Sequence, residues 1–180
     1  MRNLAADKKV AQKNISKIQT LIPRKLLVKE DKIAKKQAKS SDSDINKLQQ
    51  LFKLTEELTS KISPVTSCKA GCKINVSITK LEAELISEYT GMAINKSVAL
   101  GKLDYHGSSC TFLIDNKCSV YSVRPFVCRR QVSVMPSEHW CHPDLNLDVE
   151  VPMIEFSELS SAFYAIAARS EVKDIRAWFG

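Results

Sequence analysis

Six cysteines, all between residues 68 and 141, constrain this 180-residue chain more than any other feature of its sequence. Three of them lie in CTFLIDNKCSVYSVRPFVCRR, which starts at Cys110, and they are eight and ten residues apart. The others are Cys68 and Cys72 in SCKAGCK and Cys141 in HWCHP. Cysteines scattered through a hydrophobic core would not gather in one segment. The pattern therefore predicts sulfurs that converge on a metal ion.

Short turns are expected to hold the cysteines of the CTFLIDNKC segment in place. Asp115-Asn116-Lys117 is typical of a tight turn between two apolar runs, which predicts a β-hairpin over residues 112–121. Arg124-Pro125 favours the start of a short helix, because proline suits the first helical position. Cys128 follows one turn later, so a hairpin and a helix start could direct three sulfurs to one point.

The remaining sequence predicts helices, from apolar residues at helical spacing and from capping signals. In the first third, we expect a helix over residues 5–22 stopped by Pro23 and a weaker helix from Leu26 to about Lys36. A third helix is capped by Asp44, runs to Ile62 and ends at Pro64, and a fourth runs from the Thr79–Glu82 capping box to just before Gly91. A last helix from Ser157 to Ala167 is followed by a short turn from Val172 to Phe179. The predicted fold class is mainly α with a small β-hairpin. We expect a loop-rich, metal-centred α+β domain over residues 41–180 and a basic helical arm over residues 1–40, joined by the Ser40–Ser43 linker.

Positive charge is concentrated in the first 40 residues. They hold 12 Lys and Arg against 3 acids, a net of +9, whereas the remaining 140 hold 15 basic and 17 acidic residues, a net of −2. An acidic partner, protein or nucleic acid, is therefore a candidate for the arm. The alternative is a solvated helix that packs loosely on the domain. Lysine predominates and no aromatic residue is interleaved, so base stacking is not expected.

The N-terminal sequence indicates a cytoplasmic protein. MRNLAADKKVAQKN is charged, no apolar run of a signal peptide follows it, and no stretch approaches the roughly 20 apolar residues of a membrane span. Lasting disulfides are uncommon in a reducing cytoplasm, where clustered cysteines more often bind metal or act in catalysis. Three structural disulfides in an exported protein remain the alternative.

The region from about residue 65 to 145 resembles the YkgJ-type cysteine-cluster family, whose domains are described as zinc- or iron-chelating. The matching residues are Cys110, Phe112, Leu113, Cys118, Ser119, Tyr121, Arg124, Pro125, Cys128 and Arg129. Upstream, the Cys68–Cys72 loop and the stretch from Val76 to the helix capped at Thr79 fit the family outline. The Cys-Cys pair that the family carries after this loop is missing, and Lys73-Ile74-Asn75-Val76 stands in its place.

The six cysteines are all candidate metal ligands: Cys68, Cys72, Cys110, Cys118, Cys128 and Cys141. We expect Cys68, Cys72, Cys118 and Cys128 to form a four-thiolate site, with Cys110 almost equally suited. Cys141 would be a spare ligand or part of a second site. Four thiolates suffice for tetrahedral zinc or for an iron–sulfur cluster.

Histidines and arginines near the cysteines have secondary roles in this hypothesis. His139 and His142 could donate nitrogen, although a histidine beside a loop cysteine is more often exposed. His106 is expected to be structural. Arg129 and Arg130 would lower the thiolate pKa values and offset the charge of a four-sulfur site. Arg124 would bond neighbouring carbonyls and hold the turn.

The cofactor predicted from this pattern is zinc or iron, with a [4Fe–4S] cluster favoured by the number of cysteines around one locus. Three functional classes follow. The first is a metal-binding protein without catalysis. The second is an iron–sulfur enzyme or accessory protein related to protein lysine N-methylation, because some relatives are similar to flagellin lysine N-methylase. With five glycines and no glycine-rich loop after a strand, the chain has no credible S-adenosylmethionine site. The third is a redox or metal sensor whose basic arm contacts an acidic partner.

Overall fold

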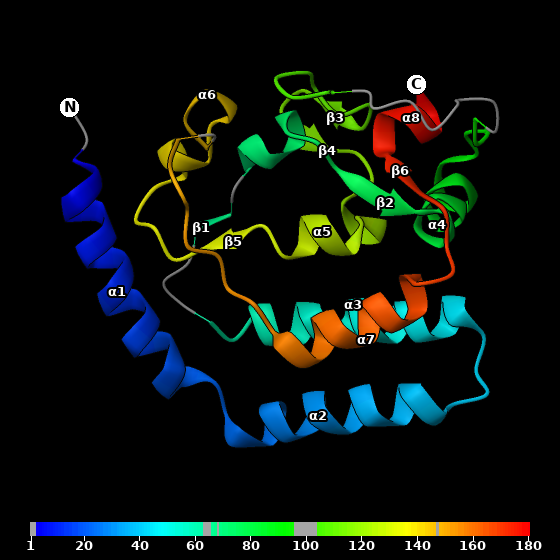
Figure 1. Ribbon diagram of the computed structural model, residues 1–180, viewed down its shortest axis with the longest axis horizontal. Coiled ribbons are helices and arrows are strands. Elements are labelled where there is room, and N and C mark those ends of the chain that lie inside the picture. The colour runs from blue at the N-terminus through cyan, green and yellow to red at the C-terminus, as the bar shows by residue number, and fades with distance from the viewer. Residues whose placement is uncertain (1–2, 63–65, 68, 96–103, 147) are drawn as a thin grey trace.

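The computed structural model describes residues 3–62, 66–67, 69–95, 104–146 and 148–180 of the chain (Figure 1). Its helices are α1 (Leu4–Leu21), α2 (Arg24–Lys39), α3 (Asp44–Thr59), α4 (Lys80–Thr90), α5 (Phe126–Arg129), α6 (Pro143–Asn146), α7 (Ser157–Ala167) and α8 (Ile175–Phe179), with 3-10 helices η1 (Lys69–Lys73), η2 (Tyr121–Val123) and η3 (Glu138–Cys141). The strands are β1 (Thr66–Ser67), β2 (Ser77–Thr79), β3 (Leu113–Ile114), β4 (Lys117–Cys118), β5 (Val132–Ser133) and β6 (Val172–Asp174). The fold is mainly helical with small β elements, as predicted.

Helices α2, α3 and α7 lie side by side below α5 and the small strand pairs (Figure 1). The apolar residues of α3 recur at steps of three and four, so one face of the helix is buried. They form a core cluster with α4, α5 and α7 that contains Leu48, Leu51, Phe52, Leu54, Leu58, Leu85, Phe126, Leu159 and Ala162. This cluster gives the short α5 a rigid support.

A buried carboxyl group of α2 caps α7 from outside the helix. Phe156 occupies the N-cap position of α7 and makes no side-chain cap bond. The Glu30 carboxylate, 5% exposed, instead accepts a hydrogen bond from the Leu159 backbone N–H at 3.3 Å. Burial raises the pKa of Glu30, while the backbone bonds oppose that shift. The contact joins the basic N-terminal segment to the core.

Helix α1 is also packed on the rest of the chain. Ala11 and Ile18 are buried in a cluster that includes Met135 and Trp140. The Trp140 Nε1–H donates to the Asp7 carboxylate at 2.8 Å. The arm predicted for residues 1–40 therefore consists of two helices, α1 and α2, that both bury side chains against the remaining structure. Among the described residues, no helix is both long and apolar enough to cross a membrane.

The predicted hairpin is confirmed but is shorter than residues 112–121: it forms β3 and β4, Lys117 belongs to β4 rather than to the turn, and Tyr121 begins η2. Leu113 pairs with Cys118 and Ile114 with Lys117. Asp115 and Asn116 have φ values of 48° and 57°, the left-handed conformation that a tight two-residue hairpin turn requires and that these residue types tolerate. The turn chemistry in the sequence therefore placed Cys118 at the end of a strand.

Two other antiparallel pairs join distant parts of the chain and were not predicted. Strand β1 pairs with β5, and β2 pairs with β6. The second pair places Ser77 opposite Asp174, so the C-terminal segment lies beside the start of α4. Val172–Phe179 was predicted as a single turn, but it is strand β6 followed by helix α8. Short strands of this kind leave almost no local pattern, because their partners lie far away in sequence.

Helix boundaries differ from the predictions by a few residues. Ser43, not Asp44, is the N-cap of α3, and its hydroxyl accepts from the Asn46 N–H. Helix α3 ends at Thr59 rather than Ile62, and Pro64 lies outside the described residues. The Thr79–Glu82 capping box is confirmed. Serine and aspartate are comparable caps, so local chemistry does not choose between adjacent candidates.

Candidate metal centre

The described part of the chain contains four free cysteines, which come from four different segments. Cys72 lies in η1, Cys110 precedes β3, Cys118 ends β4, and Cys128 lies in α5. The last three pack against a second core cluster, formed by Val76, Ile78, Ala83, Ile86, Phe112, Val120, Ile175, Trp178 and Phe179. The predicted hairpin and helix start therefore bring sulfurs to one side of a common core.

Backbone hydrogen bonds connect the segments that carry these cysteines. The Cys110 N–H donates to the Cys72 carbonyl at 2.7 Å, although the two residues are far apart in sequence. The Leu113 N–H donates to the Cys110 carbonyl at 3.0 Å, and Leu113 pairs with Cys118 across the hairpin. Positions 72, 110 and 118 are thus linked through the main chain, which limits how far these cysteines can separate.

Burial and mutual repulsion both disfavour thiolates at this locus. Burial raises the pKa of Cys72, with a further rise from Cys118. Burial also raises the pKa of Cys110 to about 11. The pKa of Cys128 is raised by burial first and then by Cys110, Cys72 and Cys118. The thiols are close enough to repel one another when ionised, so a cation among them would offset both effects.

The thiols do not yet form a closed coordination shell in the structure. Among the described residues, no three Cys, His, Asp or Glu side chains converge closely enough to hold an ion. Cys68 lies outside the described residues. Cys141 is 4% exposed and disulfide-bonded, so it is not one of the free thiols. The donor chemistry of the remaining four fits a thiolate-bound metal, and binding would require their segments to close further.

The three histidines lie in different environments. The His106 ring nitrogen Nε2 is 2.9 Å from the Pro143 carbonyl oxygen, as expected for a structural residue. His139 is exposed and its ring makes an edge contact with the Trp140 ring. His142 is also exposed and its Nδ1 lies 3.3 Å from an Asp144 carboxylate oxygen.

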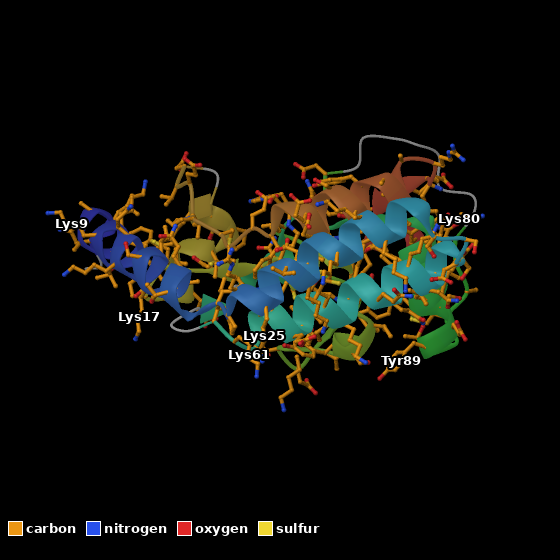
Figure 2. The ribbon with its side chains drawn as sticks, turned by 90° about the horizontal axis from the view of Figure 1, so that it is seen from below. Lys9, Lys17, Lys25, Lys61, Lys80 and Tyr89 are labelled. Carbon is orange, nitrogen blue, oxygen red and sulfur yellow. The ribbon has the colours of Figure 1, made fainter. Side chains whose placement is uncertain are left out.

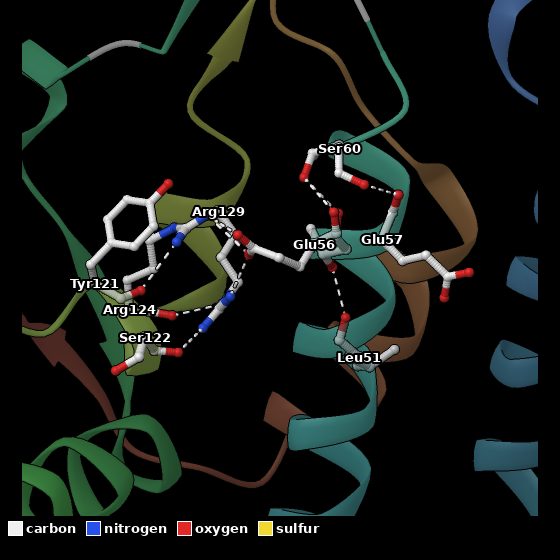
Figure 3. A network of polar contacts seen from close by, with 10 residues as sticks. Leu51, Glu56, Glu57, Ser60, Tyr121, Ser122, Arg124 and Arg129 are labelled. Carbon is white, nitrogen blue, oxygen red and sulfur yellow. Dashed lines mark hydrogen bonds and ion pairs between the residues drawn. The ribbon is translucent and has the colours of Figure 1, made fainter.

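Arginines hold the turn between Cys118 and Cys128 against helix α3 (Figure 3). Arg124 donates to the Tyr121 carbonyl at 3.1 Å, which matches the predicted contact with a neighbouring carbonyl. Arg129 is 5% exposed and donates to the carbonyls of Arg124 and Ser122 at 2.9 and 2.7 Å. Both guanidinium groups also bind the Glu56 carboxylate. The two arginines therefore connect α3 to the start of α5.

Arg130 likewise makes contacts to other parts of the fold. Its guanidinium donates to the Glu155 carboxylate at 3.1 Å and to the Tyr164 hydroxyl at 3.2 Å. Arg129 and Arg130 are not among the main influences on the pKa of Cys128. Burial lowers the pKa of Arg129, and Cys128 is one of the groups that oppose this shift, so Arg129 and Cys128 do interact. The cation that lowers the pKa of both Cys72 and Cys110 is Arg176.

Sequence reasoning missed Glu56, Asp174 and Arg176 as residues that support the cysteine segments. The Asp174 carboxylate accepts from the Val76 N–H at 2.7 Å, and Arg176 donates to the Ile74 carbonyl at 2.7 Å. The segment that stands where the family has a Cys-Cys pair is thus held by the C-terminus. A charged residue far from a motif gives no local signal of such a contact.

Comparison with known proteins agrees with this arrangement of cysteines. The model of one family, CxxCxxCC, matches residues 64–143 and is described as a "Putative zinc- or iron-chelating domain". The match includes all six cysteines. No curated protein and no solved structure matches the chain. Residues 64–143 therefore form a domain of the CxxCxxCC family, the YkgJ-type zinc- or iron-chelating family.

Proposed function

We propose that this chain is a metal-binding protein that holds zinc or iron through the thiolates of Cys72, Cys110, Cys118 and Cys128. The observation that supports this most directly is the packing of Cys110, Cys118 and Cys128 against one core cluster, with Cys72 joined to Cys110 by a backbone hydrogen bond. All four lie within the segment that matches a chelating domain. Four thiolates leave no open position on a zinc ion, so such a site would stabilise structure or store metal rather than activate water. The same donor set would also accept an iron–sulfur cluster.

The proposed location is the cytoplasm, because the four free thiols must remain reduced to bind a metal; the disulfide at Cys141 is of a kind that is uncommon there. Anaerobic purification followed by elemental analysis and an absorption spectrum distinguishes the two metals. Zinc gives a colourless protein, whereas an iron–sulfur cluster gives a brown one with broad visible absorption. Complete alkylation of the four cysteines in freshly isolated protein, with no bound metal, would exclude the proposed site.

Cys118→Ser and Cys128→Ser are expected to lose most of the bound metal and to reduce the yield of soluble protein. Each change removes one of four ligands, and the binding free energy of a structural metal contributes directly to folding. Cys141→Ser is the control for metal content, since Cys141 is disulfide-bonded and does not belong to the free-thiol set; its own effect on stability is that of a lost disulfide. Metal content per chain, measured on all three variants at equal protein concentration, tests the ranking. Equal metal content in the three would contradict it.

A second candidate function rests on the lysine-rich outer face of α1. Lys8, Lys9, Lys13 and Lys17 are all exposed, and the only acid of this helix, Asp7, accepts a hydrogen bond from Trp140. Lys9 and Lys17 project from α1, and Lys25 projects from the start of α2 (Figure 2). Point charges repeated along one helix suit the phosphate backbone of a nucleic acid. We propose a sequence-independent contact with that backbone.

Charge removal on α1 tests this contact. A quadruple Lys→Gln variant at positions 8, 9, 13 and 17 is expected to abolish a shift of duplex DNA mobility that the wild-type chain produces. About four phosphate contacts would make the wild-type affinity fall about a hundredfold between about 50 and 200 mM salt. Lys80→Gln and Lys117→Gln, exposed lysines outside α1, are controls. Unchanged DNA binding by the quadruple variant would eliminate the proposed nucleic-acid surface.

A further inference from the structure

A buried ion pair near the C-terminus lies outside the segment that matches the chelating domain. The Arg176 Nε–H donates to Asp174 Oδ1 at 2.8 Å, and Nη2 donates to Asp174 Oδ2 at 2.9 Å. Arg176 is 7% exposed, and its guanidinium carbon lies 4.9 Å from the centre of the Tyr105 ring. Asp174 is also the N-cap of α8. The guanidinium is thus fixed on one edge by a carboxylate that is itself held in place.

The other edge of the Arg176 guanidinium bridges two loops. Nη1 donates to the Ser108 carbonyl at 2.7 Å, and Nη2 donates to the Ile74 carbonyl at 2.7 Å. Ile74 lies two residues after Cys72, and Ser108 lies two residues before Cys110. One planar group therefore sets the separation of the two cysteine-bearing loops, a geometry that a flexible ammonium group cannot reproduce.

The bridged loops are also joined to each other directly. The Cys110 N–H donates to the Cys72 carbonyl and the Gly107 N–H donates to the Lys73 carbonyl, both at 2.7 Å. The Val76 N–H donates to Asp174 Oδ2, which continues the network into β2. Loss of the guanidinium would leave the direct bonds between the loops but would remove their connection to α8.

We propose that Arg176 is a positioning residue of the metal centre, which ties the Cys72 and Cys110 segments to α8 and supplies positive charge beside their thiolates. The inference rests on the proposed thiolate site. Charge complementarity supports it, because the buried Arg176 guanidinium donates to carbonyls that lie two residues from Cys72 and two residues from Cys110. A four-thiolate site carries excess negative charge, which a buried guanidinium would offset.

Two variants of the full chain separate positioning from general stability. Arg176→Lys retains the positive charge but loses the planar fork. The double variant Asp174→Asn/Arg176→Gln removes the guanidinium together with its carboxylate partner, so no unpaired buried carboxylate is left to cause misfolding. Leu51→Ala serves as a control for lost stability because Leu51 is fully buried in the other core cluster. Arg169→Gln serves as a control for lost surface charge because Arg169 is exposed.

The measurements are affinity for Zn²⁺ by competition with a chelator, the absorption spectrum of the Co²⁺-substituted protein, and thermal unfolding without metal. We expect both Arg176 variants to bind Zn²⁺ about 10-fold or more weakly and to shift the thiolate–Co²⁺ absorption. The double variant should show the larger loss. Leu51→Ala should unfold at lower temperature yet retain the wild-type Co²⁺ spectrum, and Arg169→Gln should match the wild type in all three.

Wild-type affinity and a wild-type Co²⁺ spectrum in Arg176→Lys and in the double variant would overturn the inference, whatever their thermal stability. If the double variant does not fold, the result for Arg176→Lys alone decides. The proposed function itself would be rejected by another result: a wild-type chain that binds neither Zn²⁺ nor Co²⁺ and contains no iron when isolated.

Discussion

Trp178→Ala is expected to lower the free energy of unfolding by about 3–5 kcal/mol, a typical cost of truncating a buried aromatic side chain. Trp178 is 1% exposed and lies in the core cluster against which Cys110, Cys118 and Cys128 pack. Its indole N–H donates to the Ile78 carbonyl at 3.3 Å, which would lose this donor. The change would therefore create a cavity and remove one hydrogen-bond donor from this carbonyl.

Urea unfolding followed by circular dichroism measures this loss. Tyr89→Ala is the matched control, because Tyr89 is 56% exposed at the end of α4, and a change of less than about 0.5 kcal/mol is expected there. The same experiment with added Zn²⁺ shows whether metal binding compensates for the cavity. Equal unfolding midpoints for the two variants without metal would show that α8 is not part of the core.

Glu82→Ala is expected to destabilise the fold by about 3 kcal/mol, because it leaves buried N–H groups without an acceptor. Glu82 is 2% exposed. One of its carboxylate oxygens accepts from the Thr79 N–H at 2.8 Å and from the Thr79 hydroxyl at 2.9 Å. The other accepts from the Phe126 N–H at 2.8 Å. This one side chain therefore caps α4 and also fixes the start of α5, which carries Cys128.

Glu82→Gln should have an intermediate effect, since an amide has one acceptor oxygen and cannot serve Thr79 and Phe126 together. Glu84→Ala is the control on the same helix, where the residue makes a partly exposed ion pair with Lys80 worth little to stability. Chemical unfolding of the three variants tests the expected order of destabilisation, which is largest for Glu82→Ala, intermediate for Glu82→Gln and smallest for Glu84→Ala. A Glu82→Ala chain as stable as the Glu84→Ala chain would contradict the dual capping role.

Local sequence signals predicted the elements whose interactions are short-range. The hairpin turn at Asp115-Asn116 and the capping box at Thr79–Glu82 both depend on residues within a few positions of one another. The second bond of Glu82, to the Phe126 N–H, joins residues 44 positions apart and had no counterpart in the sequence pattern. The sequence therefore predicted the capping bonds of Glu82 to Thr79, which are local, but not its bond to Phe126, which is not.

The candidate site divides in the same way. Cysteine spacing identified Cys110, Cys118 and Cys128 as a group, and turn chemistry indicated how a hairpin and a helix would present them. The charge assignments were only partly right. Burial lowers the pKa of Arg129 and Cys128 opposes that shift, so the two residues do interact, but the hydrogen bonds of Arg129 go to Glu56 and two carbonyls. The cation that influences Cys72 and Cys110 is Arg176. Which arginine faces a sulfur depends on how segments pack, and neighbouring residues in the sequence do not specify that.

The amino-acid order alone determined that this chain is mainly helical, that its thiols occur on tight, well-specified turns, and that its first 40 residues are strongly basic. Each of these properties is set by residue type and by spacing within a turn or two of chain. Only the tertiary structure decided that β6 and α8 return to β2, so that Arg176 bridges the loops of Cys72 and Cys110. This arrangement depends on the burial of Trp178 and on the hydrogen bond of Asp174, which join residues about 100 positions apart in the sequence. The energy of such contacts depends on the whole packed core.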